Sequence, residues 1–234
     1  MSDRHFLSRS FVYFAIASAD LACAAAARAE VKIVAIGDSN LDVPLITENN
    51  MYPAQLERAL LARGHKVTVT NLGRRGDTTQ GVLDRLDRHV PEGTDIAIVG
   101  VGANDQAVYK LSLETVRNNL ATIVKRLRGR GIEVLVFGIG NLNNSTCCWG
   151  RLMAEQNGAL FYRHFQDGLI DDPALHSENV RPIPKTDGRV DLKATMWHLN
   201  EKGNRLVVQN TLPLVEALIA RVDARVAVPK APEP

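Results

Sequence analysis

The stretch "VKIVAIGDSNLDVP", residues 31–44, joins an apolar run to a polar turn. Its first part, residues 31–37, is short and rich in β-branched side chains, which is typical of a strand buried in a parallel sheet. The chain then becomes polar at Asp38 and Ser39. The Ser39 hydroxyl is either a nucleophile on a turn after a strand or the N-cap of a helix. Other parts of the chain must decide between these two interpretations.

The same rhythm of strands and helices continues along the chain. Further apolar runs cover residues 66–72, 95–102 and 132–140, with a weaker one at 159–162. Amphipathic stretches with helical spacing lie at 52–64, 78–90, 112–131 and 200–222. Gly64 is expected to end the first and Ser112 to cap the third, whereas Pro213 is expected to interrupt the last. This alternation predicts an α/β fold whose parallel sheet carries helices on both faces.

The composition is that of an ordinary globular chain. It has 234 residues, of which 45% are apolar and 23% are charged, so one domain is the default expectation. The formal charge is only +2. Such a charge gives no electrostatic reason to expect nucleic acid or an anionic membrane as a partner.

The N-terminal 29 residues have the pattern of a secretory signal peptide. Arg4 and Arg9 precede an apolar run of small residues, and Ala27-Arg28-Ala29 fits a small-x-small cleavage site. The alternative is a helical or disordered arm. The run is too short for a stable membrane span, so no membrane insertion is expected after cleavage. The sequence thus predicts a secreted or periplasmic protein, with a signal peptide at 1–29, one domain at 30–224 and a Pro-rich disordered tail at 225–234.

If residues 1–29 are removed, two cysteines remain, Cys147 and Cys148, and they are adjacent in the sequence. A secreted protein permits a disulfide, but a bridge between adjacent residues needs a strained geometry, and two free thiols are the simpler interpretation. The chain has no Cys-x-x-Cys pattern and no Cys/His cluster that suggests zinc, so no metal is expected.

Polar residues follow the strands at the edge where open parallel sheets bind ligands. A serine hydroxyl needs a base, and His198 lies just before the last helix, beside an asparagine, Asn200, that can cap it. A developing oxyanion needs neutral donors, which the Asn104 side chain and the Gly76 backbone N–H can supply. Two aspartates nearby, Asp77 and Asp105, are expected to tie loops together through backbone N–H groups.

These residues resemble the four-block pattern of the SGNH (GDSL) hydrolases: Gly37-Asp38-Ser39, Gly76, Gly102-x-Asn104-Asp105 and His198. The stretches "NLGRRGDTTQGVLDRL" and "VGVGANDQ" are similar to the bacterial periplasmic branch of thioesterases, lysophospholipases and arylesterases. The resemblance covers residues 31–222. It implies a three-layer α/β/α sandwich of flavodoxin-like type, with a central parallel sheet of about five strands.

The resemblance also assigns the chemistry. It implies Ser39 as the nucleophile and His198 as the base, with an oxyanion hole formed by the N–H groups of Ser39 and Gly76 and by the Asn104 side chain. It implies a small-molecule ester or acyl substrate and no cofactor or metal.

The chain departs from the family pattern at the residue that orients the base. Thr195 stands three residues before His198, where the family has an aspartate. Asp191 or Asp187 can replace that acid, or a backbone carbonyl can orient the imidazole of a Ser–His dyad. For Asp191 the simpler interpretation is an exposed carboxylate on a loop. A second departure is a shortened segment at 138–159, where Cys147-Cys148-Trp149 are expected to line the acyl pocket. The alternatives to a secreted esterase are a weakened, ligand-binding relative and an envelope-polysaccharide deacetylase or acyltransferase.

Overall fold

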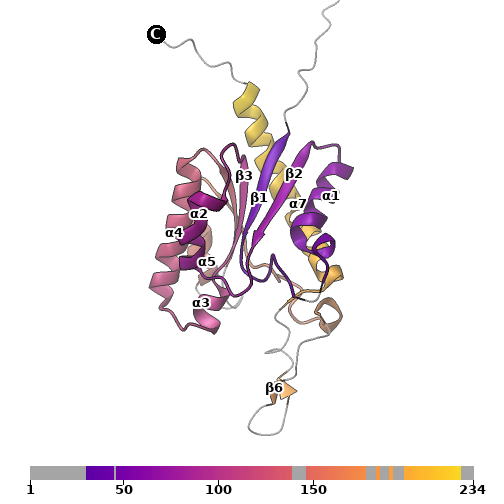
Figure 1. Ribbon diagram of the computed structural model, residues 1–234, viewed down its shortest axis with the longest axis vertical. Coiled ribbons are helices and arrows are strands. Elements are labelled where there is room, and N and C mark those ends of the chain that lie inside the picture. The colour runs from indigo at the N-terminus through magenta and orange to yellow at the C-terminus, as the bar shows by residue number, and fades with distance from the viewer. Residues whose placement is uncertain are drawn as a thin grey trace, which may run out of the picture.

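Five parallel strands form the central sheet of this protein, of which a computed structural model describes residues 30–44, 46–138, 146–177, 183–184, 190–191 and 198–227. The strand order is β2-β1-β3-β4-β5 (Figure 1). The strands are β1 (Val31–Gly37), β2 (Val67–Gly73), β3 (Ile96–Gly100), β4 (Glu133–Phe137) and β5 (Leu160–Tyr162). This order and the parallel pairing confirm the expected flavodoxin-like arrangement.

Helices cover both faces of the sheet and complete three layers. One face carries α1 (Tyr52–Ala62) and α7 (Glu201–Ala227), and the other carries α2 (Thr79–His89), α4 (Leu113–Gly129) and α5 (Thr146–Gln156) (Figure 1). The shorter elements are α3 (Ala103–Ala107), η1 (Glu48–Asn50), η2 (Pro173–Leu175) and the antiparallel pair β6 (Ile183–Pro184) and β7 (Val190–Asp191).

Strand β1 shows why the run at 31–37 has no polar face. Ile33 and Ala35 pack into the core under α1 and α7, whereas Val34 and Ile36 pack into the core under α2 and α4. Successive side chains of a strand point to opposite faces, so the part of a central strand that lies between two layers of helices must be apolar on both sides, whereas Lys32, near the start of β1, is exposed. All four side chains are buried.

The expected helix ends are confirmed. Gly64 has a φ of +83° directly after the end of α1, a conformation that glycine adopts without strain. The Ser112 hydroxyl accepts a hydrogen bond from the Thr115 N–H at 3.1 Å. The Asn200 side chain accepts one from the Gly203 N–H at 3.1 Å and so caps α7.

Helix α7 differs from the sequence prediction in two respects. It runs through Pro213 without a break and ends at Ala227, three residues beyond the expected domain end at 224. Proline removes the N–H that would bond to the carbonyl of Gln209. Both residues are exposed, so water can satisfy that carbonyl, while the opposite face of α7 stays buried on the sheet. Helices α3 and α5 were not expected from the sequence.

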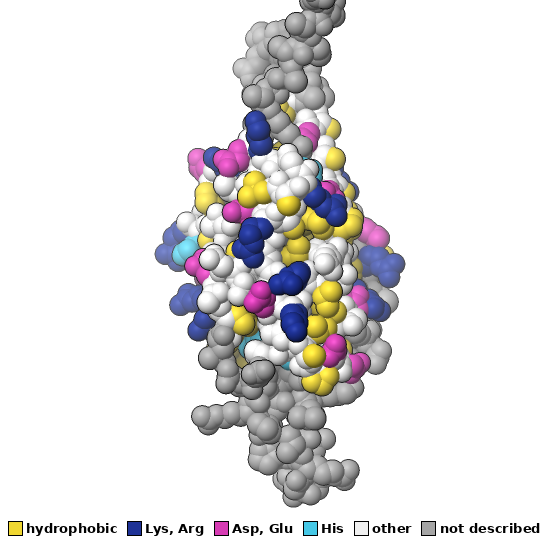
Figure 2. Space-filling model, turned by 90° about the vertical axis from the view of Figure 1, so that its right-hand side faces the viewer, with side chains coloured by type: hydrophobic (Ala, Val, Ile, Leu, Met, Phe, Trp, Pro, Cys, Tyr) yellow, Lys and Arg dark blue, Asp and Glu magenta, His cyan; other side chains and the backbone are white. Residues whose placement is uncertain are grey.

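Charged side chains of both signs are interspersed on the face that Figure 2 shows, as the small formal charge leads one to expect. Among the described residues, no helix is both long and apolar enough to cross a membrane.

Candidate active site

Three glycines stand in one row at the carboxyl end of the sheet. Gly37 of β1 pairs with Gly73 of β2 on one side and with Gly100 of β3 on the other. The segments that carry Ser39, Gly76 and Asn104 therefore leave the sheet side by side. The row is tightly packed, since a Cβ on Gly37 would lie 2.0 Å from the Gly100 carbonyl oxygen.

Ser39 lies on a tight turn directly after β1 and is half-buried. The turn is held by a hydrogen bond from the Asp38 N–H to the Gly100 carbonyl at 3.1 Å and by one from the Leu41 N–H to the Asp38 carbonyl at 3.1 Å. Residues 40–44 form turns and bends, and no helix begins there. The interpretation of Ser39 as a helix N-cap is therefore wrong.

Asp38, one residue before Ser39, is a buried carboxyl with only one of its oxygens satisfied. Its Oδ1 accepts hydrogen bonds from the Asn40 backbone N–H at 3.0 Å and from the Asn40 Nδ2 at 3.1 Å. Its Oδ2 has no hydrogen-bond partner among the residues that the structure describes. Burial raises the pKa of Asp38 to about 6, against a smaller lowering by the two bonds from Asn40.

A cavity of about 30 Å³ adjoins this turn, and its lining includes Asp38, Phe137 and His164. The His164 Nδ1 accepts a hydrogen bond from the Gln166 N–H at 3.2 Å. Burial lowers the pKa of His164, which favours the neutral imidazole. The cavity therefore offers a polar wall close to the proposed nucleophile, with room for about one water.

The two expected oxyanion donors are brought together by a direct contact. The Asn104 Nδ2 donates a hydrogen bond to the Asp77 carbonyl oxygen at 2.9 Å, and this carbonyl belongs to the residue after Gly76. Gly76 itself is exposed and has a φ of +75°, a conformation that favours glycine. The amide of Asn104 has a second N–H that remains available to a ligand.

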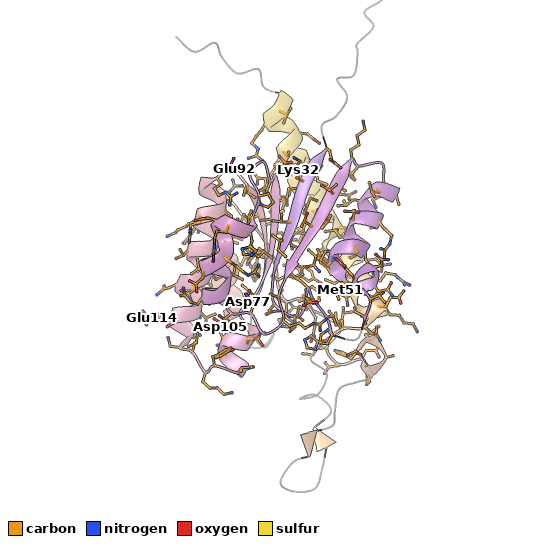
Figure 3. The ribbon with its side chains drawn as sticks, in the orientation of Figure 1. Lys32, Met51, Asp77, Glu92, Asp105 and Glu114 are labelled. Carbon is orange, nitrogen blue, oxygen red and sulfur yellow. The ribbon has the colours of Figure 1, made fainter. Side chains whose placement is uncertain are left out.

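The expected structural roles of Asp77 and Asp105 are confirmed. The Asp77 Oδ1 accepts a hydrogen bond from the Thr78 N–H at 3.0 Å, and the Asp105 carboxylate accepts one from the Thr79 N–H at 3.0 Å. Asp105 thus binds the first turn of α2, where a carboxylate is stabilised by the helix dipole. Figure 3 shows both aspartates at the carboxyl end of the sheet, opposite the end that carries Lys32.

His198 is half-buried and leads into α7. Its carbonyl accepts a hydrogen bond from the Ser177 N–H at 3.1 Å, and the following residue, Leu199, pairs with His176 in a single β-bridge. Burial lowers the pKa of His198, and the nearby positive charge of Arg75 lowers it further. The neutral imidazole, which is the form that can accept a proton, is thereby favoured.

Arg75 connects this histidine to the serine turn. Its Nη2 lies 3.1 Å from the Asp42 Oδ1, and its Nε donates to the Asp42 carbonyl at 3.2 Å. Asp42 is three residues after Ser39, so the arginine whose charge acts on His198 also binds the turn that carries the serine.

A wider groove of about 460 Å³ starts at the Gly76 loop. Its lining is mostly polar and includes Arg74, Gln80 and Asp84, and Tyr109 contributes an aromatic ring that is 58% exposed. This groove offers space for a substrate beside the expected oxyanion hole.

Several expected residues lie outside what the structure describes. These are Thr195 and Asp187, together with the side chains of Asp191, Cys147 and Cys148. Trp149 is described, and its ring packs against the core under α2 and α4, with the Arg117 guanidinium 5.4 Å from the ring centre. Within the described ranges, no group of three or more His, Cys, Asp or Glu side chains is placed to hold a metal ion.

The sequence reasoning missed Arg85, which is buried beneath the strand ends. It donates hydrogen bonds to the Leu72 carbonyl at 2.9 Å and to Asp77 at 2.8 Å. A signal was present, because Arg85 occupies the same helical stripe as the buried residues Val82 and Leu86. An arginine at a core position needs buried partners.

The chain is similar in sequence to a known family and to characterised proteins. A sequence model of the GDSL-like Lipase/Acylhydrolase family matches residues 35–206. An arylesterase of Vibrio mimicus is 31% identical over 119 residues, which cover 49% of this chain and 58% of the relative.

Two solved structures are similar to the whole fold. The crystal structure of TesA has a TM-score of 0.66 at 20% identity, covering 80% of this chain and 99% of that one. The SGNH-hydrolase family esterase AlinE4 has a TM-score of 0.62 at 26% identity, covering 82% of this chain and 98% of that one.

Proposed function

We propose that this chain, which belongs to the GDSL-like lipase/acylhydrolase family, is a serine esterase that cleaves carboxylic esters or thioesters through an acyl-enzyme on Ser39. One observation carries the proposal. The segments bearing Ser39, Gly76 and Asn104 leave one row of glycines, and the bond from Asn104 to the Asp77 carbonyl holds the last two together. A nucleophile beside neutral hydrogen-bond donors is the arrangement that acyl transfer requires.

The chemistry follows from these positions. His198 takes the Ser39 hydroxyl proton while Oγ attacks the ester carbon, so that the carbonyl electrons move onto oxygen. The Ser39 and Gly76 N–H groups and the free N–H of Asn104 stabilise this oxyanion. When it collapses, the bond to the leaving group breaks, and His198 returns the proton to the departing alcohol or thiol. A water activated by His198 then cleaves the acyl-enzyme by the same steps.

His198 requires a group that fixes its tautomer. In this chain Thr195 stands where the family has an aspartate, and Asp191 is our candidate for the third member. A backbone carbonyl acting on a Ser–His dyad is the alternative. In either arrangement, the lowered pKa of His198 keeps the base unprotonated at neutral pH.

The decisive experiment removes one hydroxyl. Ser39→Ala should abolish turnover of p-nitrophenyl acetate, because no other group is proposed to carry the acyl-enzyme. Ser112→Ala is the matched control, since this serine caps α4 and has no role in the mechanism. Full turnover by Ser39→Ala would sink the assignment. A folded wild-type protein that turns over no ester would favour the alternative, a weakened relative that binds an acyl or saccharide ligand.

The groove at Gly76 supports a second candidate substrate. Its exposed Tyr109 ring and its polar lining suit a sugar ester better than a long acyl chain, so deacetylation or acyl transfer on an envelope polysaccharide is the alternative. Rates on p-nitrophenyl acetate, p-nitrophenyl palmitate and an acetylated oligosaccharide distinguish the candidates. A strong preference for palmitate would exclude the polysaccharide.

We also propose that residues 1–29 direct export, leaving a domain that begins at residue 30, in a secreted or periplasmic protein. The support is the sequence pattern that ends at Ala29. The N-terminal sequence of the protein recovered from a bacterial periplasm tests it, and an intact N-terminus in the cytoplasm would contradict it.

A further inference from the structure

We infer that Arg85 is a positioning residue that holds the oxyanion hole in its productive geometry. The inference rests on the proposed function, because it assumes that Gly76 and Asn104 bind the oxyanion. It adds a residue that none of the four sequence blocks contains.

Arg85 contacts the backbone at the ends of two strands. Its side chain projects from α2, and the residue is only 6% exposed. Its Nη2 donates to the Leu72 carbonyl of β2 at 2.9 Å and lies 3.3 Å from the Gly37 carbonyl of β1. Gly37 is two residues before Ser39, so one guanidinium joins the strand of the nucleophile to the strand that leads to Gly76.

The same guanidinium holds the loop that follows β2. The Arg85 Nε donates to the Asp77 Oδ2 at 2.8 Å, and both side chains are about 7% exposed. A Cβ on Gly81 would lie 2.0 Å from the Asp77 Oδ1, so the carboxylate is also packed against the backbone of α2. Asp77 in turn accepts the hydrogen bond from Asn104. Arg85 is therefore linked to all three segments of the site.

Gly76 is held in place through its neighbours, since the pair of Arg85 with Asp77 anchors one side of it and the bonds of Arg75 to Asp42 anchor the other. It is exposed, and no atom lies within 4 Å of the position a Cβ would take. The bonds that set its orientation come from its neighbours: Arg74 N–H donates to the Gly37 carbonyl at 2.9 Å, and Asp77 N–H donates to the Arg74 carbonyl at 3.0 Å. Releasing Asp77 would free the Gly76 N–H to turn away.

A contribution to stability does not by itself explain why Arg85 and Asp77 are buried as an ion pair. Desolvating two charges offsets most of their attraction, so apolar residues of similar size are often at least as stabilising. Oxyanion donors, by contrast, must stay within a fraction of an ångström of their place in the transition state. A rigid guanidinium with several fixed N–H groups meets that need.

The test compares Arg85→Lys and Arg85→Met with the wild-type protein on p-nitrophenyl acetate. Lysine keeps the charge but cannot bind two carbonyls and a carboxylate at once, so kcat should fall at least about 10-fold with KM nearly unchanged. Methionine should lower kcat further. Arg128→Lys is the matched control, because Arg128 binds the buried Glu133 at 2.8 Å and the Ile132 carbonyl at 3.0 Å beside the amino end of β4. It should keep the full kcat.

A double-mutant cycle separates positioning from folding. In a protein that already carries Asn104→Ala, the change Arg85→Lys should lower kcat far less than it does alone, because the two residues act on one oxyanion hole. Equal losses in both backgrounds, or an unchanged kcat with a lower melting temperature, would overturn the inference and leave Arg85 a purely structural residue. Wild-type turnover no higher than that of Ser39→Ala would overturn the proposed function as well.

Discussion

The buried carboxyl of Asp38 should make the stability of the folded protein depend on pH. The residue is 1% exposed, and its Oδ2 has no hydrogen-bond partner in the described part of the chain, so ionising it inside the folded protein is costly. Its pKa rises from 3.8 to about 6 on folding. At about 1.36 kcal/mol for each pH unit, this difference lowers the stability by roughly 3 kcal/mol once the group is ionised in both states.

The direction follows from proton binding. Between about pH 4 and pH 6 the folded state holds the Asp38 proton more tightly than the unfolded chain does, so raising the pH removes stability. Asp38→Asn should abolish this loss, because asparagine keeps an acceptor for the two bonds from Asn40 and carries no charge. We expect the variant to be more stable by up to about 3 kcal/mol at pH 8 and by less than about 1 kcal/mol at pH 4.

Urea unfolding followed by far-UV circular dichroism at pH 4, 6 and 8 measures the effect. Asp84→Asn is the control, since Asp84 is exposed and its substitution should change stability by less than about 0.5 kcal/mol at each pH. A gain that is the same at pH 4 and pH 8, or no gain at pH 8, would refute the reasoning.

Two further predictions concern the strand ends and the base. Gly37→Ala should lower the melting temperature and the esterase rate, because the added Cβ would lie 2.0 Å from the Gly100 carbonyl oxygen. Gly129→Ala is the control and should lower neither, because no described atom outside its own stretch of α4 lies within 4 Å of its added Cβ. Equal melting temperatures for the two variants would contradict this account of the packing. Arg75→Gln should move the acidic limb of the kcat/KM profile to higher pH, because losing the positive charge raises the pKa of His198. An unmoved limb would show that Arg75 does not act on the base.

The sheet could be predicted from the sequence because each of its strands is recognised from a short stretch of neighbouring residues. Each buried strand is a short apolar run that ends in glycine and polar residues, and the core faces of α2 and α4 repeat at helical spacing. The three segments of the site follow from topology alone, since parallel strands end at one edge. Helix α5 was not predicted from the sequence.

Features that depend on several segments at once could not be predicted in this way. Arg85 is at a core position only because carbonyls of two strands and the carboxylate of Asp77 surround it, and no local pattern reports those partners. Pro213 predicts a break, but it lies on the exposed side of α7, where a lost backbone bond costs little.

The carboxyl end of the sheet carries three buried aspartates, and an oxyanion would be repelled by any that kept a full, uncompensated charge. The fold deals with each one differently. Asp77 is paired with Arg85, and Asp105 accepts hydrogen bonds from the N–H and the hydroxyl of Thr79 at the start of α2. Within the described ranges no cation pairs with Asp38, and the charges of the other two help burial to raise its pKa. The donors of Gly76 and Asn104 therefore act beside two carboxylates whose charge is offset in part, that of Asp77 by Arg85 and that of Asp105 by its hydrogen bonds to Thr79, which makes the buried polar layer part of the site.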